Sequence, residues 1–183
     1  TFHCAENYGA VLQCYATQEF LRSEGHDAKV IDYRPNYLLE PYQLFYLRRL
    51  LCRNPIHIVA NLIKELIHLP KRCYRRRAYR RFSKQYLKLT ETVDSNSIPS
   101  SFDGYVVGSD QIWNAAITQG FDNVFFCKFP FSKEKKKYIA YAASMGKVEL
   151  SDDNVKEMFS LDYSEIPNFP VSTVQGHKGK FVF

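Results

Sequence analysis

A tight turn, Asn7-Tyr8-Gly9, stands directly before a helical pattern, and this junction constrains the fold more than any other stretch of the chain. Apolar residues recur at helical spacing as far as Leu21, and a buried strand is predicted at 28–33. Residues 1–3 are predicted to be the end of an earlier strand. Strand, turn, helix and strand form a βαβ unit. We therefore expect an α/β fold, a Rossmann-like parallel sheet with helices on both faces.

The rest of the chain supplies more strands and a long helical stretch. Residues 36–89 have a helical pattern that Pro41, Pro55 and Pro70 divide into three pieces, and the last two prolines suit helix starts. Further strands are predicted at 104–108, 123–129 and 136–144. We expect a Rossmann-like domain over 1–150 with a helical insertion at about 36–89. The pattern fails after 150, so 151–183 is interpreted as an irregular tail, the truncated start of a second domain.

The net charge of +6 comes from one segment, residues 71–84. This run holds eight of the 25 Lys and Arg residues and no acid, and the other 17 are outnumbered by 19 acidic residues, a net of −2. Three interpretations stay open: a solvated face, contact with an anionic membrane surface, or nucleic-acid binding. The last ranks lowest because no nucleic-acid module motif accompanies the run. Membrane contact would use Arg75, Arg76, Arg77, Arg80 and Arg81.

Cysteine and histidine spacing favours neither a disulfide framework nor a metal site. The five cysteines are odd in number and no CxxC occurs, so we expect a reducing, cytoplasmic setting. No signal peptide is recognisable, and no stretch reaches the ~20 apolar residues of a membrane span. We expect no metal and no tightly held cofactor.

Small and polar residues gather where three predicted strands end. They lie in the segments 3–9, 108–114 and 144–146. Because the carboxyl ends of parallel strands meet at one edge, where open α/β sheets bind ligands, the sequence predicts a binding site there.

Each candidate has a chemical role and a structural alternative. The turn at Gly9 opens a helix N-terminus that suits a phosphate or carboxylate, or Asn7 simply caps the helix. Asp110 suits sugar hydroxyls or general-base chemistry, or it caps a turn. His3 could exchange protons or be structural. Trp113 could stack on a sugar, although a place in the core is favoured.

Four blocks, NYGAVLQCYATQEFL (7–21), VIDYRP (30–35), VVGSDQIWN (106–114) and KYIAYAASMG (137–146), resemble the polysaccharide pyruvyl transferase family. The resemblance implies a two-domain fold similar to GT-B glycosyltransferases. It also implies transfer of a pyruvyl group from phosphoenolpyruvate to sugar hydroxyls of a surface polysaccharide or its lipid-linked precursor. Asp110 and His3 are the acid/base candidates. The expected substrate-binding residues are Asn7, Tyr8, Gly9, Gln13, Gly108, Ser109, Gln111, Trp113, Asn114, Ser144 and Gly146.

Family members are longer, and we expect much of the donor pocket, including its cations, in the second domain. Cys14, Thr17 and Met145 depart mildly from the family pattern at packing positions. Two rival functions remain: a GT-B glycosyltransferase that uses a nucleotide sugar, and an inactive binding module whose basic helix docks on lipid or polymer. For the enzyme we expect a cytoplasmic location at the inner face of the membrane.

Overall fold

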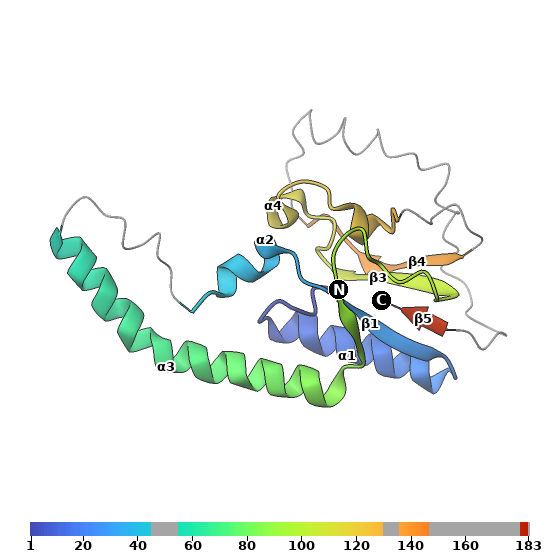
Figure 1. The fold of residues 1–183 in the computed structure, drawn as a ribbon, viewed down its shortest axis with the longest axis horizontal. Helices are drawn as coiled ribbons and strands as arrows, with labels where there is room; N and C mark the ends of the chain where they lie inside the picture. Colours follow the sequence, from blue (N-terminus) through green and yellow to red (C-terminus); the bar gives the residue numbers. More distant parts are fainter. Residues whose placement is uncertain (45–54, 130–135, 147–179, 183) are drawn as a thin grey trace.

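One five-stranded sheet organises the protein, and all its neighbouring strands run parallel (Figure 1). The computed structural model describes residues 1–44, 55–129, 136–146 and 180–182. The strand order is β2-β1-β5-β3-β4. In chain order the strands are β1 Asp27–Tyr33, β2 Leu89–Val93, β3 Gly104–Asp110, β4 Lys137–Ala143 and β5 Lys180–Val182.

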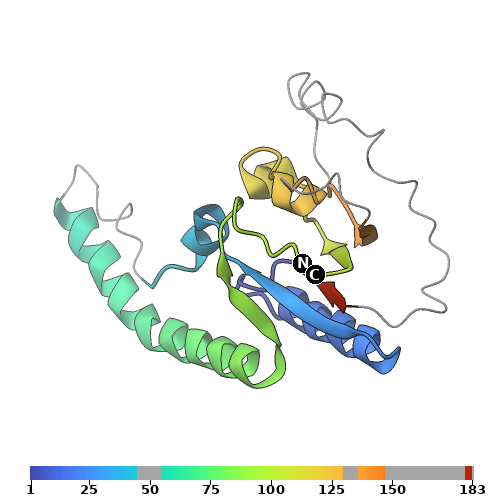
Figure 2. The same ribbon diagram turned by 45° about the vertical axis from the view of Figure 1, so that its right-hand side comes forward.

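The described helices differ greatly in length. Two are long and four are short turns of α- or 3₁₀-helix. They are α1 Tyr8–Ser23, α2 Asn36–Leu39, η1 Glu40–Tyr42, α3 Pro55–Tyr86, α4 Ala115–Thr118 and η3 Asn123–Phe126. The long α3 extends away from the sheet in both views (Figures 1 and 2).

Helix α1 covers one face of the sheet. The side chain of Asn7 caps it by accepting hydrogen bonds from the amides of Gly9 and Ala10. Its buried Cys14 and Leu21 pack on alternate residues of the strands, with Val30 and Val106 in the same cluster. Every second residue of the strands therefore packs against the residues that recur along one face of α1, and together they form one core.

The opposite face is covered by η3 and the loop before β3. Tyr105 of β3 is 1% exposed and packs with Ile98, Val124 and Phe129. The alternate strand residues, which point away from α1, pack into this second cluster, and Ile31 is one of them. Helical segments thus lie on both faces, which confirms the expected α/β class.

Two segments share the central position between β1 and β3. β5 pairs with the first residues of both strands, at Asp27–Lys29 and at Gly104–Tyr105. Residues 1–3 lie beyond it, and the N-terminus is close to β5 (Figures 1 and 2). Thr1 Oγ1 donates a hydrogen bond to the carbonyl oxygen of Gly108 in β3. The predicted strand end at 1–3 is wrong, because Thr1 and Phe2 have no regular secondary structure and a turn begins at His3.

The strand predicted at 123–129 is also wrong. Asp122 accepts a hydrogen bond from the amide of Val124 and starts the 3₁₀-helix η3 instead. Val124 and Phe125 are buried by this turn. A short apolar run does not distinguish a buried strand from a buried helical turn, and here the capping aspartate decides.

The helical insertion is shorter and less divided than predicted. Pro70 lies inside α3 rather than at a helix start. Proline removes one backbone hydrogen bond, but an ion pair between Glu65 and Arg72 spans that turn. The helix ends at Tyr86. Leu89–Val93 forms the edge strand β2, whose first residue was predicted to belong to the helical stretch 36–89.

The irregular tail expected at 151–183 falls almost wholly outside the described residues. Only Lys180–Val182 is described there, and it forms β5 in the middle of the sheet. These three residues were expected in an irregular tail and differ from that expectation.

Candidate functional site

The carboxyl ends of β1, β3 and β4 meet at one edge of the sheet, as the parallel pairing requires. β3 and β4 pair as far as Asp110 and Ala143. The segments predicted to form the site, 108–114 and 144–146, therefore leave the sheet side by side.

Backbone hydrogen bonds join these two segments beyond the last strand pair. The Ser144 amide donates to the carbonyl oxygen of Asp110 at 3.0 Å, and the Trp113 amide donates to that of Ser144 at 3.2 Å. Ser144 Oγ also lies 3.4 Å from the Asp110 carbonyl oxygen. The two motif blocks thus form one structural unit.

Gln111, Asn114 and Gly146 form the polar centre of this unit. Asn114 Nδ2 donates to Gln111 Oε1 at 2.8 Å, and Asn114 Oδ1 accepts from the Ala116 amide at 3.0 Å. A Cβ on Gly146 would lie 2.5 Å from Gln111 Oε1. Gly146 is therefore needed for Gln111 to keep this position. Because the two amides hold each other, any sugar contact would use their remaining hydrogen-bonding groups.

Asp110 is exposed and has a positive φ of 77°. That conformation is uncommon for a residue with a side chain, and such backbone strain often occurs at functional sites. Ser109 beside it is half-buried. Among the predicted polar residues of β3, Asp110 therefore has the side chain most available to a ligand.

Trp113 serves packing. Its indole nitrogen donates to the carbonyl oxygen of Phe125 at 2.8 Å, and its ring stacks on Phe126 with centroids 5.4 Å apart. These contacts fix the segment after β3 against η3. They agree with the core interpretation of this residue.

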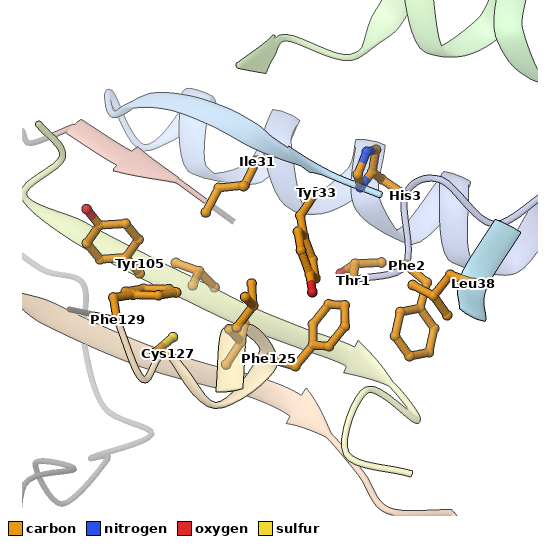
Figure 3. A pocket seen from close by; sticks show the side chains of 13 residues that line it. Thr1, Phe2, His3, Ile31, Tyr33, Leu38, Tyr105, Phe125, Cys127 and Phe129 are labelled. Carbon is orange, nitrogen blue, oxygen red and sulfur yellow. The ribbon is translucent and has the colours of Figure 1, made fainter. Parts of the chain in front are cut away.

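His3 lies in a buried network at the end of β1. Its Nε2 is 2.8 Å from Asp32 Oδ1, and the ring is 6% exposed. Arg34 Nε donates to the same carboxyl oxygen at 2.6 Å, and Thr92 Oγ1 donates to the other at 2.7 Å. Figure 3 places the His3 ring beside the end of β1.

This network shifts the pKa values of both titratable partners. Burial lowers the pKa of His3, against the opposing effect of Asp32. Burial alone would raise the pKa of Asp32, but hydrogen bonds from His3, Arg34 and Thr92 hold it well below its ordinary value. A neutral imidazole therefore faces an ionised carboxylate at neutral pH.

Some of the free backbone amides at the start of α1 already have a hydrogen-bond partner within the turn. Asn7 occupies the amides of Gly9 and Ala10, which are groups that a bound anion would use. Tyr8 is 65% exposed, and its ring lies against Tyr79 of α3. Gln13 is half-buried on the first turns of α1.

The sequence prediction did not include the arginine side chains that the structure brings to this edge. Arg75 and Arg76 of α3 both lie within ion-pair distance of Glu6, at 3.3 and 3.1 Å, and Arg34 joins Asp32. The basic run was interpreted as a separate surface, and Arg34 carried no assigned role. A lone acid between two arginines leaves a net positive charge beside the α1 turn.

The predicted residues thus form two groups on one edge. Those of β3 and β4 form one, and those around His3 and Asn7 form the other. Within the described residues Thr1 links them through its bond to Gly108. No direct hydrogen bond between Asp110 and His3 occurs there.

A cavity of about 40 Å³ lies against residues 1–3, His3 included, and is lined mainly by apolar side chains (Figure 3). Phe2, Val107 and Phe125 are among its lining residues. Tyr33 and Tyr37 donate hydrogen bonds to Asp122 beside it. The cavity is too small and too apolar for a sugar or phosphate, so it belongs to the core.

Neither a metal centre nor a membrane span is found in the part of the chain that the structure describes. No cluster of three or more His, Cys, Asp or Glu side chains there could hold a metal ion. Within the same residues, no helix combines the length and apolar character needed to cross a bilayer.

A parallel sheet with its polar residues at the carboxyl edge defines a Rossmann-like α/β protein. Residues 7–162 match the polysaccharide pyruvyl transferase family, and the chain belongs to that family. The matched range contains both motif blocks of the site, so this is a chain from a family of transferases that act in polysaccharide biosynthesis.

Short local similarities join the chain to purine nucleoside phosphorylases. It is 63% identical over 30 residues to purine nucleoside phosphorylase of Mus musculus, which covers 16% of this chain and 10% of that protein. It is 52% identical over 31 residues to purine nucleoside phosphorylase 1 of Geobacillus stearothermophilus, covering 17% and 11%. The chain thus spans about a tenth of the length of the curated relatives it matches. No solved structure matches the chain.

Proposed function

We propose that the protein transfers a pyruvyl group from phosphoenolpyruvate to a sugar hydroxyl of a surface polysaccharide or its lipid-linked precursor. The observation that carries the proposal is the family match over residues 7–162, which includes the joined segments after β3 and β4. The acceptor sugar would lie at that edge, against Ser109, Gln111 and Ser144.

The reaction needs proton transfer in both directions. Protonation of the donor's methylene carbon makes a methyl group and an oxocarbenium-like carbon next to it. One sugar hydroxyl attacks that carbon and loses its proton to a base. The bond from the carbon to the phosphate oxygen then breaks, a second hydroxyl attacks the same carbon to close the ketal, and its proton goes to the departing phosphate. Asp110 is proposed as the group that exchanges these protons with the acceptor, because it is exposed at the end of β3.

His3 is the second proposed acid/base group. Asp32 holds its Nε2 at 2.8 Å, an arrangement that fixes ring orientation in many catalytic histidines. Its burial supports a role close to the donor, away from solvent. The acid/base pair would then consist of one exposed carboxylate and one buried imidazole.

The donor carries a phosphate and a carboxylate, so it needs positive groups. The α1 turn at Asn7–Gly9 supplies the positive end of a helix, with the amides of Gly9 and Ala10 already bonded to the side chain of Asn7. Arg34, Arg75 and Arg76 add positive charge next to it. These residues support anion binding at the edge, in addition to the cations expected from a second domain.

The donor assay separates this function from its enzyme rival. The protein is incubated with a polysaccharide or lipid-linked acceptor and either phosphoenolpyruvate or a panel of nucleotide sugars. We expect phosphate release and a pyruvate ketal on the acceptor with phosphoenolpyruvate alone. Sugar transfer from a nucleotide donor without ketal formation would favour the glycosyltransferase. We place this activity in the cytoplasm, at the inner face of the membrane.

A further inference from the structure

Helix α3 exposes an unusually apolar surface along its N-terminal half. Five aliphatic side chains there are between 42% and 67% exposed. They are Val59, Leu62, Ile63, Leu66 and Ile67. Spacings of three and four residues place them in one stripe, which we call the α3 apolar stripe.

The stripe faces away from the protein. Glu65, on the opposite side of the helix, is 2% exposed and pairs with Arg72. Arg72 also donates to the carbonyl oxygen of Leu44 at 2.9 Å. Glu65 is thus buried, whereas Lys64 and His68, which also lie away from the stripe, are exposed. This half of α3 therefore projects from the protein, with its apolar stripe in solvent.

The C-terminal half of α3 continues the same outward face with positive charge. Arg77 follows Val59 by about five whole turns and is exposed, as are Arg80, Arg81 and Lys84. We call these four residues the α3 basic cluster. Tyr79 and Phe82, on the other side, contact rings of α1.

The structure divides the five arginines first assigned to membrane contact into two groups. Arg75 and Arg76 turn inward to Glu6 and hold α3 against the start of α1. Arg77, Arg80 and Arg81 remain on the outward face. Tyr74, which is 78% exposed, lies between the stripe and the cluster.

The composition of α3 restricts what can cover this face. Glu65 is the only acidic residue between Pro55 and Tyr86, and it is buried. A second copy of the same helix would bring like charges and no acid to meet them. A suitable partner must offer apolar and anionic groups together over the length of a 32-residue helix.

We propose that the outward face of α3 lies on an anionic lipid bilayer. Helices that bind in the plane of a membrane combine an apolar stripe with Lys and Arg, and aromatic rings at the boundary. The α3 apolar stripe would enter the acyl boundary, and the α3 basic cluster would meet anionic headgroups. This surface is distinct from the sheet edge, and its binding does not depend on the transferase reaction.

Vesicle flotation with the full chain tests the surface. The vesicles are made either of phosphatidylcholine alone or of phosphatidylcholine mixed with phosphatidylglycerol. Arg77, Arg80 and Arg81 are changed together to Gln. The matched control changes Lys88, Lys128 and Lys137, three exposed lysines elsewhere, to Gln. A third variant carries Ile63→Asn and Ile67→Asn.

We expect binding to the anionic vesicles that weakens at raised salt. The triple arginine variant should lose roughly 100-fold in affinity, from about fivefold for each basic residue at the surface, while the lysine control binds almost normally. The double isoleucine variant should also bind more weakly. Because all eight substituted side chains are exposed, thermal midpoints should stay unchanged and report intact folding.

Two outcomes would overturn the proposal. One is equal vesicle affinity of the arginine variant and the lysine control. The other is no binding of the wild type to the anionic vesicles. Concentration-dependent dimers by analytical ultracentrifugation that disappear in the double isoleucine variant would then assign the face to a second copy of the chain.

Discussion

The backbone of Gly108 in β3 lies directly against the carbonyl group of Tyr141 in β4. A Cβ on Gly108 would overlap the carbonyl oxygen and lie 2.7 Å from the carbonyl carbon, and its φ is 131°. Only glycine allows this approach. It brings the two strand ends together where the motif segments begin.

Gly108→Ala should therefore destabilise the protein severely. We expect a loss of about 3 kcal/mol or more in the free energy of unfolding, from combined overlap and backbone strain. Gly120→Ala is the matched control, because φ there is 120° but the space around the position is open. Strain alone should cost it about 1–3 kcal/mol. Denaturant unfolding measures both, and equal losses would show that the contact with Tyr141 does not matter.

The His3–Asp32 pair should make stability depend on pH. Because burial lowers the pKa of His3 in the folded state, the unfolded chain binds a proton more readily. The free energy of unfolding should then fall as pH drops below His3's ordinary value of 6.5. The depressed pKa of Asp32 adds a further loss below its ordinary value of 3.8.

Thermal unfolding between pH 7 and pH 5 isolates the histidine contribution. His3→Gln should flatten the dependence, while His68→Gln, at an exposed site on α3, should leave it as it is. A His3→Gln variant with the full wild-type slope would mean that His3 does not cause it.

Glu6 should hold α3 against the start of α1. Glu6→Gln weakens two charged hydrogen bonds, to Arg75 and Arg76. We expect a loss of about 1–3 kcal/mol in stability and faster hydrogen exchange in the C-terminal half of α3. Glu19→Gln, which removes the exposed pair with Arg22, should change little. Unchanged exchange in α3 would contradict the proposed anchor.

Cysteine labelling checks the packing of α1 and η3. Burial raises the pKa of Cys14 and of Cys127 to about 12, so both thiols should resist a maleimide in the folded protein. Cys73 on α3 is exposed and should react. With Cys52 replaced by Ser, mass spectrometry should find the modification at Cys73 before the other two. Early labelling of Cys14 would contradict the α1 packing.

Periodicity and end signals in the sequence predicted the elements that have long, regular patterns. The turn at Asn7, the end of α1 and the strands at Val30 and Val106 were found this way, because capping groups and alternating burial leave direct traces. Pro70 and the run at Val124 misled the prediction. At the first, α3 continues through the proline, and an ion pair between Glu65 and Arg72 of the same helix spans it. At the second, an aspartate cap starts a 3₁₀-helix in place of a strand.

The arrangement of the candidate site could be predicted in part, whereas the roles of its residues stay predictions. The joined segments after β3 and β4 follow from the parallel sheet, since strand ends share an edge. The contacts of Arg75 and Arg76 with Glu6 could not be predicted, because they depend on how a long helix returns over α1. The positive charge of α3 can be predicted from the sequence. Which of its arginines face inward depends on the tertiary packing.

Turnover of the Asp110→Asn variant tests the central claim most directly. Pyruvate ketal formation from phosphoenolpyruvate is measured for the wild type, for Asp110→Asn and for Asp27→Asn, an exposed aspartate at the opposite end of the sheet. If Asp110 transfers protons in the reaction, its variant should lose about 10²-fold or more in kcat, with stability unchanged and Asp27→Asn fully active. Wild-type turnover in Asp110→Asn would contradict the account.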